Sequence, residues 1–184
     1  MRIFLDTEFT ELTRDAQLIS IGLAAENGDW FYAELTDYDS TFINPWVKEN
    51  VLTLLTGPKL SNAQYVHTKP YMACRGDIVD VSRALRRWLA RFGEKNSVHI
   101  WADVLAWDWV LFCHVFNGAF FIPEQVFWIP FDLSTLLLTK GLDPNVTRET
   151  LGQVDLQVPK LKLAKHHALY DAWLEKVIFE GLGG

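Results

Sequence analysis

The sequence predicts an α/β fold in which helices flank a central mixed β-sheet. Three observations favour this class. Strand patterns fill the first 35 residues, another apolar strand pattern lies near the middle of the chain, and helical patterns separate and follow them. The length of 184 residues is typical of one domain. We therefore expect residues 1–184 to form a single domain with its own core.

The N-terminal part predicts three strands in a meander. Residues 2–9 (RIFLDTEF) have the apolar content of a strand. Residues 17–35 predict two more strands that turn at Asn27-Gly28, a dipeptide typical of tight hairpins. Consecutive strands joined in this way are expected to pair as neighbours in one sheet.

Two helices and a loop are expected next. Residues 44–55 place Pro45 near a helix start and apolar residues at helical spacing. Residues 56–76 contain prolines and glycines without a clear period, which predicts a loop. Residues 77–92 predict an amphipathic helix. Its expected buried stripe consists of Ile78, Val81, Leu85, Trp88, Leu89 and Phe92.

The second half of the chain predicts one more buried strand and several helices. The expected elements are a strand at 97–102, helices at 106–116 and 132–139, a loop turning into helix at 142–150, and a last helix at 166–179 that ends at Gly181. Asp132 precedes the short helix in the position of an N-cap.

Composition excludes several classes of protein. The net charge of −6 and the pI of about 5.3 argue against a basic protein that coats nucleic acid, but a metal site is itself built from acids. Cys74 and Cys113 have no zinc-type spacing, which favours a reduced, cytoplasmic protein. No secretory signal is expected, because Asp6 and Glu8 interrupt the N-terminal apolar run, and polar residues break the apolar stretch 109–131.

The first strand carries two acids on one face. Because strand side chains alternate, Phe4, Asp6 and Glu8 point to one side, whereas Ile3, Leu5 and Thr7 point to the other. Two carboxylates on one face repel each other, and burial increases the cost. Either the acids lie at a solvated or arginine-paired strand end, or a divalent cation lies between them. The strand alone leaves both interpretations open.

Two further acids lie in apolar surroundings. Asp108 is flanked by Trp107 and Trp109 near a predicted helix start, and Asp171 lies inside the last predicted helix. Each acid alone would be typical of a cap or of a hydrogen-bonded buried group. Four such acids together with the pair His166 and His167 favour a metal site, since hard oxygen ligands suit Mg²⁺ or Mn²⁺.

These motifs resemble those of a known superfamily. Asp6-x-Glu8, Asp108 and His166-x₄-Asp171 resemble, in this order, the motifs of the DEDD 3′–5′ exonucleases, and the histidine is typical of the DEDDh branch. That superfamily has the ribonuclease-H-like fold. The segments FLDTEF, LISIGLAAENG, PWVKENVLTLL, IWADVLAWDWVLF and HHALYDA are most similar to the small polyadenylate-specific exoribonucleases of the RNase AS group. In the middle motif, Asp103 stands where histidine is common.

The resemblance implies a two-metal centre. Two divalent cations, Mg²⁺ or Mn²⁺, would be held by Asp6, Glu8, Asp108 and Asp171, with Asp6 as the bridging ligand. It also implies that His166 is the general base, for which a pKa near neutral is suited. His167 is the competitor, because it lies four residues before Asp171, the place of tyrosine in the related DEDDy branch. Since helical residues four apart share a face, the alternative is that His167 approaches Asp171 and is merely structural.

The substrate side is expected to be aromatic. DTEFTEL resembles the DxEMTGL motif of oligoribonucleases, which implies that Phe9 and Leu12 pack against terminal bases, although Glu11 replaces the usual glycine. Trp107 is a further expected base contact, because bases stack on aromatic side chains. Other aromatic candidates are Trp46 and Trp109, and candidate phosphate contacts are Lys160, Lys162 and Lys165, for which core packing and a solvated loop are the respective alternatives.

The sequence thus predicts a metal-dependent 3′–5′ exoribonuclease that hydrolyses single-stranded RNA and releases nucleoside 5′-monophosphates, with a preference for adenylate. A DNA exonuclease of the proofreading type and an inactive ribonuclease-H-like module that binds nucleic acid are the alternatives. The resemblance also implies a homodimer. No membrane association is expected.

Overall fold

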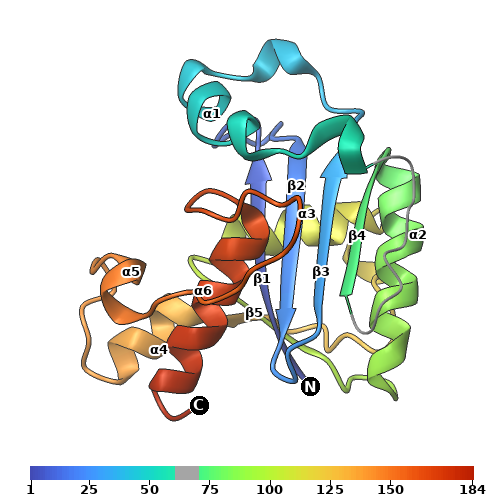
Figure 1. Ribbon diagram of the computed structural model, residues 1–184. Coiled ribbons are helices and arrows are strands. Elements are labelled where there is room, and N and C mark those ends of the chain that lie inside the picture. Colours follow the sequence, from blue (N-terminus) through green and yellow to red (C-terminus); the bar gives the residue numbers. More distant parts are fainter. Residues whose placement is uncertain (61–70) are drawn as a thin grey trace.

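The computed structural model describes residues 1–60 and 71–184 and contains a six-stranded mixed sheet within them (Figure 1). The strands are β1 (Arg2–Phe9), β2 (Leu18–Ala25), β3 (Trp30–Leu35), β4 (Tyr71–Gly76), β5 (His99–Ala102) and β6 (Phe131–Asp132). The α-helices are α1 (Pro45–Asn50), α2 (Ile78–Leu89), α3 (Ala106–Val115), α4 (Leu133–Thr139), α5 (Arg148–Leu151) and α6 (Ala168–Gly181). Short 3₁₀ turns occupy Ser40–Phe42, Leu52–Leu54, Gly57–Leu60, Ala90–Phe92 and Ala119–Phe121.

The sheet combines antiparallel and parallel pairs in the order β4-β3-β2-β1-β5-β6. Strands β1, β2 and β3 form the predicted antiparallel meander, whereas β5 runs parallel to β1, β6 parallel to β5, and β4 parallel to β3. The predicted α/β class is confirmed, and the arrangement is consistent with a ribonuclease-H-like fold. None of the helices in the described ranges is long and apolar enough to cross a membrane.

Helices cover both faces of the sheet. Helix α6 packs on β1, β2 and β3 from one side, whereas α2 and α3 pack from the other (Figure 1). Every residue of β2 and β3 is consequently buried. The predicted alternation of β1 is confirmed, because Ile3 and Leu5 belong to the core under α2 and α3, whereas Phe4 packs with residues of α4 and α6.

The predicted helices are confirmed in kind, with shifts at their ends. Helix α1 begins at Pro45 behind the N-cap Asn44, whose side chain accepts a hydrogen bond from Val47 N–H. Asp132 caps α4, as predicted, by accepting from Thr135 N–H. The predicted apolar stripe of α2 faces the core. Its fully buried residues are Val81, Leu85, Trp88 and Leu89.

Two predictions about elements are wrong. The loop predicted at 56–76 includes a 3₁₀ turn at Gly57–Leu60 and the edge strand β4, while 61–70 lie outside the described residues. Gly76, which was expected to lie in a loop, is the last residue of β4, and the residues of this strand do not alternate between apolar and polar. The last helix begins at Ala168 and not at residue 166, because His166 has a positive φ of 68° and His167 is the N-cap.

A glycine allows α6 to lie close to β2. A Cβ atom at Gly22 would lie 2.3 Å from the carbonyl carbon of Ala168, so any side chain there would push the first turn of α6 off the sheet. Gly22 is the register partner of Asp6 on the neighbouring strand. The close approach therefore brings the segment that contains His166 and Asp171 next to the acids of β1.

Candidate active site

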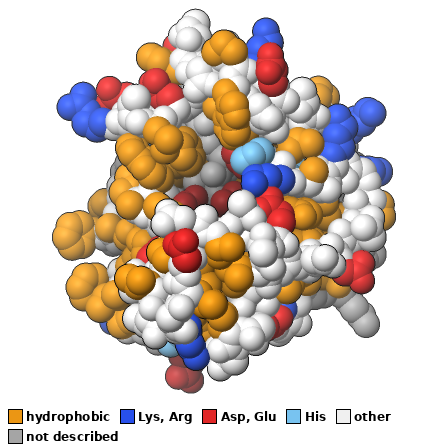
Figure 2. Space-filling view, turned by 90° about the vertical axis from the view of Figure 1, so that its left-hand side faces the viewer, with side chains coloured by type: hydrophobic (Ala, Val, Ile, Leu, Met, Phe, Trp, Pro, Cys, Tyr) orange, Lys and Arg blue, Asp and Glu red, His pale blue; other side chains and the backbone are white. Residues whose placement is uncertain are grey.

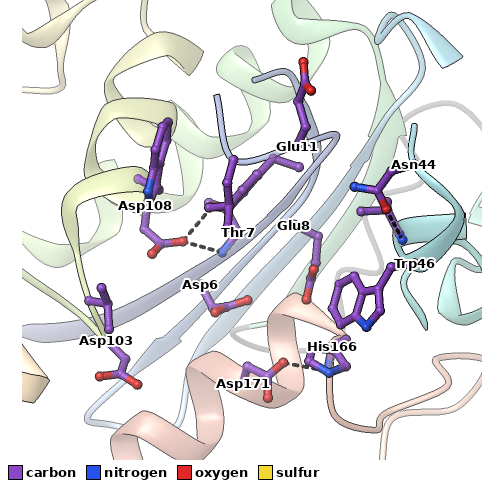
Figure 3. Close-up of a pocket in the computed structure, with 15 residues that line it drawn as sticks. Asp6, Thr7, Glu8, Glu11, Asn44, Trp46, Asp103, Asp108, His166 and Asp171 are labelled. Carbon is purple, nitrogen blue, oxygen red and sulfur yellow. Dashed lines mark hydrogen bonds between the residues drawn. The ribbon is translucent and has the colours of Figure 1, made fainter. Parts of the chain in front are cut away.

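A cavity of about 500 Å³ opens where β1 and β5 end and where α3 and α6 begin, and we call it the first cavity (Figure 3). Since β1 and β5 are parallel, their carboxyl ends meet at one edge of the sheet, a common place for ligand sites. All five residues predicted for metal binding and catalysis line it: Asp6, Glu8, Asp108, His166 and Asp171. Figure 2 shows acidic side chains at the bottom of this hollow and hydrophobic side chains around part of its mouth.

Asp6 and Glu8 project from β1 toward the start of α6 (Figure 3). Oδ2 of Asp6 is buried and has no hydrogen-bond partner among the described residues. Burial, followed by the charges of Asp171 and Asp108, raises the pKa of Asp6 well above its ordinary value. The same causes raise the pKa of Glu8 to about 9. This arrangement of carboxylates is unfavourable without a positive charge between them.

Asp108 is held in place by the strand that carries the first two acids. Its Oδ1 accepts hydrogen bonds from Thr7 N–H at 2.9 Å and from the Thr7 hydroxyl at 2.6 Å. Asp108 lies in the first turn of α3 and is buried, as the sequence predicted. Burial raises its pKa to about 6, although the two bonds from Thr7 lower it. Thr7 points away from Asp6 and Glu8 along β1, so the strand contributes to the site from both of its faces.

Asp171 and His166 are joined by a backbone hydrogen bond. Oδ2 of Asp171 accepts from His166 N–H at 2.8 Å, which fixes the turn that precedes α6 (Figure 3). Burial raises the pKa of Asp171 to about 7, although this hydrogen bond lowers it. Burial and the charge of Lys165 lower the pKa of His166, so its ring stays neutral near pH 7. The positive φ of His166 is backbone strain of the kind that gathers at functional sites.

His167 has a different role from its neighbour. Its ring is buried, stacks on Tyr32 at 4.4 Å between centroids, and does not line the first cavity. Nδ1 accepts the N–H of Leu169, which makes His167 the N-cap of α6. Burial lowers its pKa to about 4. Asp171 N–H donates to the carbonyl oxygen of His167 at 3.1 Å, so His167 approaches Asp171 through its backbone, and these contacts fit the alternative in which His167 is structural.

The donor set suits a hard divalent cation. One ligand atom each from Glu8, His166 and Asp171 lies within 4.8 Å of the other two. Asp6, with its buried Oδ2 lacking a partner in the described structure, lies beside them (Figure 3). Clustered carboxylates with raised pKa values and a free buried oxygen are what a cation site requires. The residues present therefore fit Mg²⁺ or Mn²⁺.

The aromatic residues expected on the substrate side divide into two groups. Phe9 and Trp107 stack on each other at 6.2 Å between centroids and line the first cavity, with Leu12 exposed at its rim. Trp46 also lines it, about half exposed, and lies edge-on to the His166 ring at 4.8 Å. Trp109 instead stacks on Phe112 against the core. A bulge in the β1–β2 register between Glu8 and Phe9 redirects Phe9 at the end of the strand.

The three candidate lysines are less suited to phosphate. Lys165 pairs with Glu149 at 2.9 Å, and Lys162 donates to the carbonyl of Thr53. Lys160 has a positive φ of 74° and lines neither of the two cavities at the site. The alternative interpretation of a solvated, locally paired loop fits these contacts.

A second cavity of about 390 Å³ adjoins the first and contains residues that the sequence did not indicate. The two cavities share Asp6, Asp103, His166 and Asp171, which we call the shared wall. Asp103 receives two bonds from Arg148, Nε to Oδ2 at 2.6 Å and Nη2 to Oδ1 at 2.8 Å, so its charge is paired. Glu175 lies one turn after Asp171 on α6, is buried, and lines the same cavity. Its spacing from Asp171 was the signal that could have identified it.

Comparisons with known proteins agree with the geometry. A family model described as 3′–5′ exoribonuclease Rv2179c-like domain matches residues 1–181. Two similar relatives come from Mycobacterium tuberculosis: the 3′–5′ exoribonuclease Rv2179c of strain ATCC 25618 / H37Rv and the 3′–5′ exoribonuclease MT2234.1 of strain CDC 1551 / Oshkosh. Each is 32% identical to this chain over 126 residues, which cover 68% of this chain and 67% of the relative.

Proposed function

Because the chain belongs to the 3′–5′ exoribonuclease Rv2179c-like domain family, we propose that it is a metal-dependent exoribonuclease of the DEDDh branch. It would hydrolyse single-stranded RNA from the 3′ end and release nucleoside 5′-monophosphates. The observation that carries the proposal is the convergence of four carboxylates and one histidine on a single cavity. The buried Asp6 Oδ2, which lacks a partner in the described structure, supports a cation at their centre.

The four carboxylates would hold the cations. Asp6, Glu8, Asp108 and Asp171 offer hard oxygen ligands, and Asp6 lies on the strand between the other elements of the site. Two divalent cations, when bound, supply positive charge to the phosphodiester oxygens and to the leaving 3′ oxygen. Thr7 fixes the orientation of Asp108 through two hydrogen bonds, so this ligand is held before any substrate arrives.

His166 is suited to take the proton of the attacking water. Its ring lines the cavity, and its lowered pKa keeps a nitrogen free to accept a proton at neutral pH. The hydrogen bond from its backbone to Asp171 ties the position of the base to that of a cation ligand. His167, buried against Tyr32, is a structural cap in this proposal.

The apolar side of the first cavity would receive the terminal bases. Phe9, Trp107 and Leu12 form one side of it, and Trp46 contributes a second aromatic surface next to His166. Base stacking on such surfaces tolerates any sequence, so single strands are favoured over duplexes. From the resemblance to the RNase AS group we extend the proposal to a preference for adenylate-rich 3′ ends.

The test is degradation of 5′-labelled oligomers of equal length: an adenylate RNA, a mixed RNA and a DNA of the same mixed sequence. We expect ladders that shorten from the 3′ end with Mg²⁺ or Mn²⁺, none with EDTA, and the adenylate RNA degraded fastest. Faster loss of the DNA would favour a proofreading-type enzyme. Binding of RNA without cleavage would favour an inactive module. The predicted homodimer stays a prediction, for which mass in solution at several concentrations is the measurement.

A further inference from the structure

Glu175 is an acid of the site to which no role has yet been given. It lies on α6 one turn after Asp171, so both side chains lie on the same side of the helix. It is only 4% exposed and lines the second cavity together with Asp6, Asp103 and Asp171. Buried glutamates are rare unless their charge is paired or used.

The two oxygens of Glu175 differ in what they contact. Oε1 accepts the N–H of Asp103 at 3.0 Å, which connects α6 to the turn between β5 and α3. Oε2 is buried and has no hydrogen-bond partner in the described part of the chain. The contact to Asp103 alone needs only a neutral acceptor, which a glutamine would provide. The free Oε2 is therefore the part of this side chain that a structural role leaves unexplained.

The charges that act on Glu175 are negative. After burial, the carboxylates of Asp108, Asp103 and Asp171 contribute to raising its pKa, and Glu175 in turn contributes to raising the pKa of Asp6. The neighbouring guanidinium of Arg148 is already bonded to both oxygens of Asp103. A buried carboxylate among other carboxylates is costly unless a cation offsets the repulsion.

We propose that Glu175 is a fifth carboxylate of the cation site and strengthens the binding of a divalent cation beside Asp6. The inference rests on the proposed function. Oε2 supplies charge and an acceptor without a partner among the described residues, while Oε1 holds the turn that leads into α3 and thus to Asp108. Glu175 is a positioning residue, since it acts through the cation ligands and touches no reacting atom. Residues that support metal ligands in this way change affinity by about 10- to 100-fold when replaced.

Titration of the purified protein with Mn²⁺ in a calorimeter, without RNA, tests the inference. We expect Glu175→Gln to raise the Kd for Mn²⁺ by about 10-fold or more, and to leave the cation-free protein at least as thermally stable as the wild type. The matched control is Glu180→Gln on the same helix, whose side chain pairs with Lys176 and lines neither cavity at the site. It should bind Mn²⁺ as the wild type does.

A second variant separates charge from hydrogen bonding. Glu175→Asp keeps the charge but shortens the reach to Asp103, whereas Glu175→Gln keeps the acceptor and loses the charge. Our inference expects the aspartate variant to bind Mn²⁺ more tightly than the glutamine variant. Wild-type affinity in Glu175→Gln, or the reverse order of the two variants, overturns it while leaving the exonuclease proposal intact. A wild-type protein that binds no divalent cation and degrades no RNA overturns both.

Discussion

The two cavities at the site share a wall but differ in the rest of their lining. Besides the shared wall, the first is lined by aromatic and aliphatic side chains, among them Phe9, Trp46 and Trp107. It also contains the acids Glu8 and Asp108. The second is bounded by residues 144–149 and by charged side chains, including Lys165 and Glu175. Apolar surface suits base stacking, and charge suits cations and phosphate. The first cavity therefore combines an apolar surface for bases with two of the proposed cation ligands, whereas the second adds further charged groups. Substitutions of the aromatic residues should affect mainly binding, and substitutions of the acids mainly the rate.

The largest effect should come from the shared wall. Asp6→Asn keeps the shape of both cavities but removes a charge from their common boundary, and we expect kcat to fall about 10³-fold, in line with the several kcal/mol that a cation can supply. Degradation of a labelled RNA with Mg²⁺ measures it. Asp15→Asn, at an exposed position where the side chain pairs with Arg14, is the control and should keep full activity. An Asp6→Asn protein with unchanged, EDTA-sensitive activity would show that the shared wall is not the cation site.

The two adjacent histidines should separate rate from stability. His166→Ala is expected to lower kcat by about 10²-fold or more with little change in Tm, because the ring lines the first cavity. His167→Ala should lower Tm, because it removes the helix cap and the stack on Tyr32, while the folded protein stays active. A larger loss of kcat in the second variant would reverse the assignment of the base.

The pH dependence of the rate is a further test of His166 as the base. A protonated imidazole cannot accept a proton, so the rate should fall as pH decreases through the pKa of His166. Burial lowers this pKa, which places the acid limb of kcat below the ordinary histidine value of about 6.5. An acid limb that lies above that value would contradict the burial of His166 in the working enzyme.

A smaller effect is expected when a residue that lines only the first cavity is replaced. Trp46→Ala is expected to raise KM for RNA about 10-fold, since one stacked base contributes roughly 1–3 kcal/mol, and to change kcat less than KM. The control is Trp128→Ala, which removes an exposed tryptophan that lines neither cavity at the site. A fall in kcat as large as the rise in KM would instead indicate that Trp46 acts mainly by orienting the His166 ring, which it contacts edge-on.

The sequence predicted the features of strands and helices that follow from the local spacing of apolar residues. The alternation along β1 placed Asp6 and Glu8 on one face, and the helical pattern of 77–92 identified the buried stripe of α2. The order of the acidic motifs also predicted that Asp108 and Asp171 would join them in one cavity. The edge strand β4 was missed, because its residues YMACRG do not alternate between apolar and polar and it is buried over most of its length on both faces.

Contacts between distant segments could not be predicted in the same way. The bonds from Thr7 to Asp108 join residues 101 positions apart, and no local pattern indicates them. The positive φ of His166 and the close packing of Ala168 on Gly22 are likewise not indicated by any local pattern. The roles assigned to the five site residues stay predictions until the variants above are measured.

Removal of the cation should lower the stability of the fold by an amount that depends on pH. In the cation-free protein the pKa values of Asp108, Asp171 and Glu8 are raised to about 6, 7 and 9. Carboxyl groups with raised values in the folded state stabilise the fold at low pH, and this contribution is lost as pH rises through those values. Stability without cation should therefore fall between pH 5 and pH 9.

Divalent cations bind the ionised carboxylates, so the stabilisation that Mg²⁺ provides should grow over the same interval. At 100 times the Kd, a ligand adds about 2.7 kcal/mol, which for a chain of this length corresponds to a Tm increase of roughly 5–10 °C. We expect this increase at pH 8 and almost none at pH 5, by thermal unfolding with Mg²⁺ or EDTA. Asp6→Asn should show a much smaller increase at both pH values. A Mg²⁺ effect that is equal at pH 5 and pH 8 would indicate that the cation binds away from Glu8, Asp108 and Asp171.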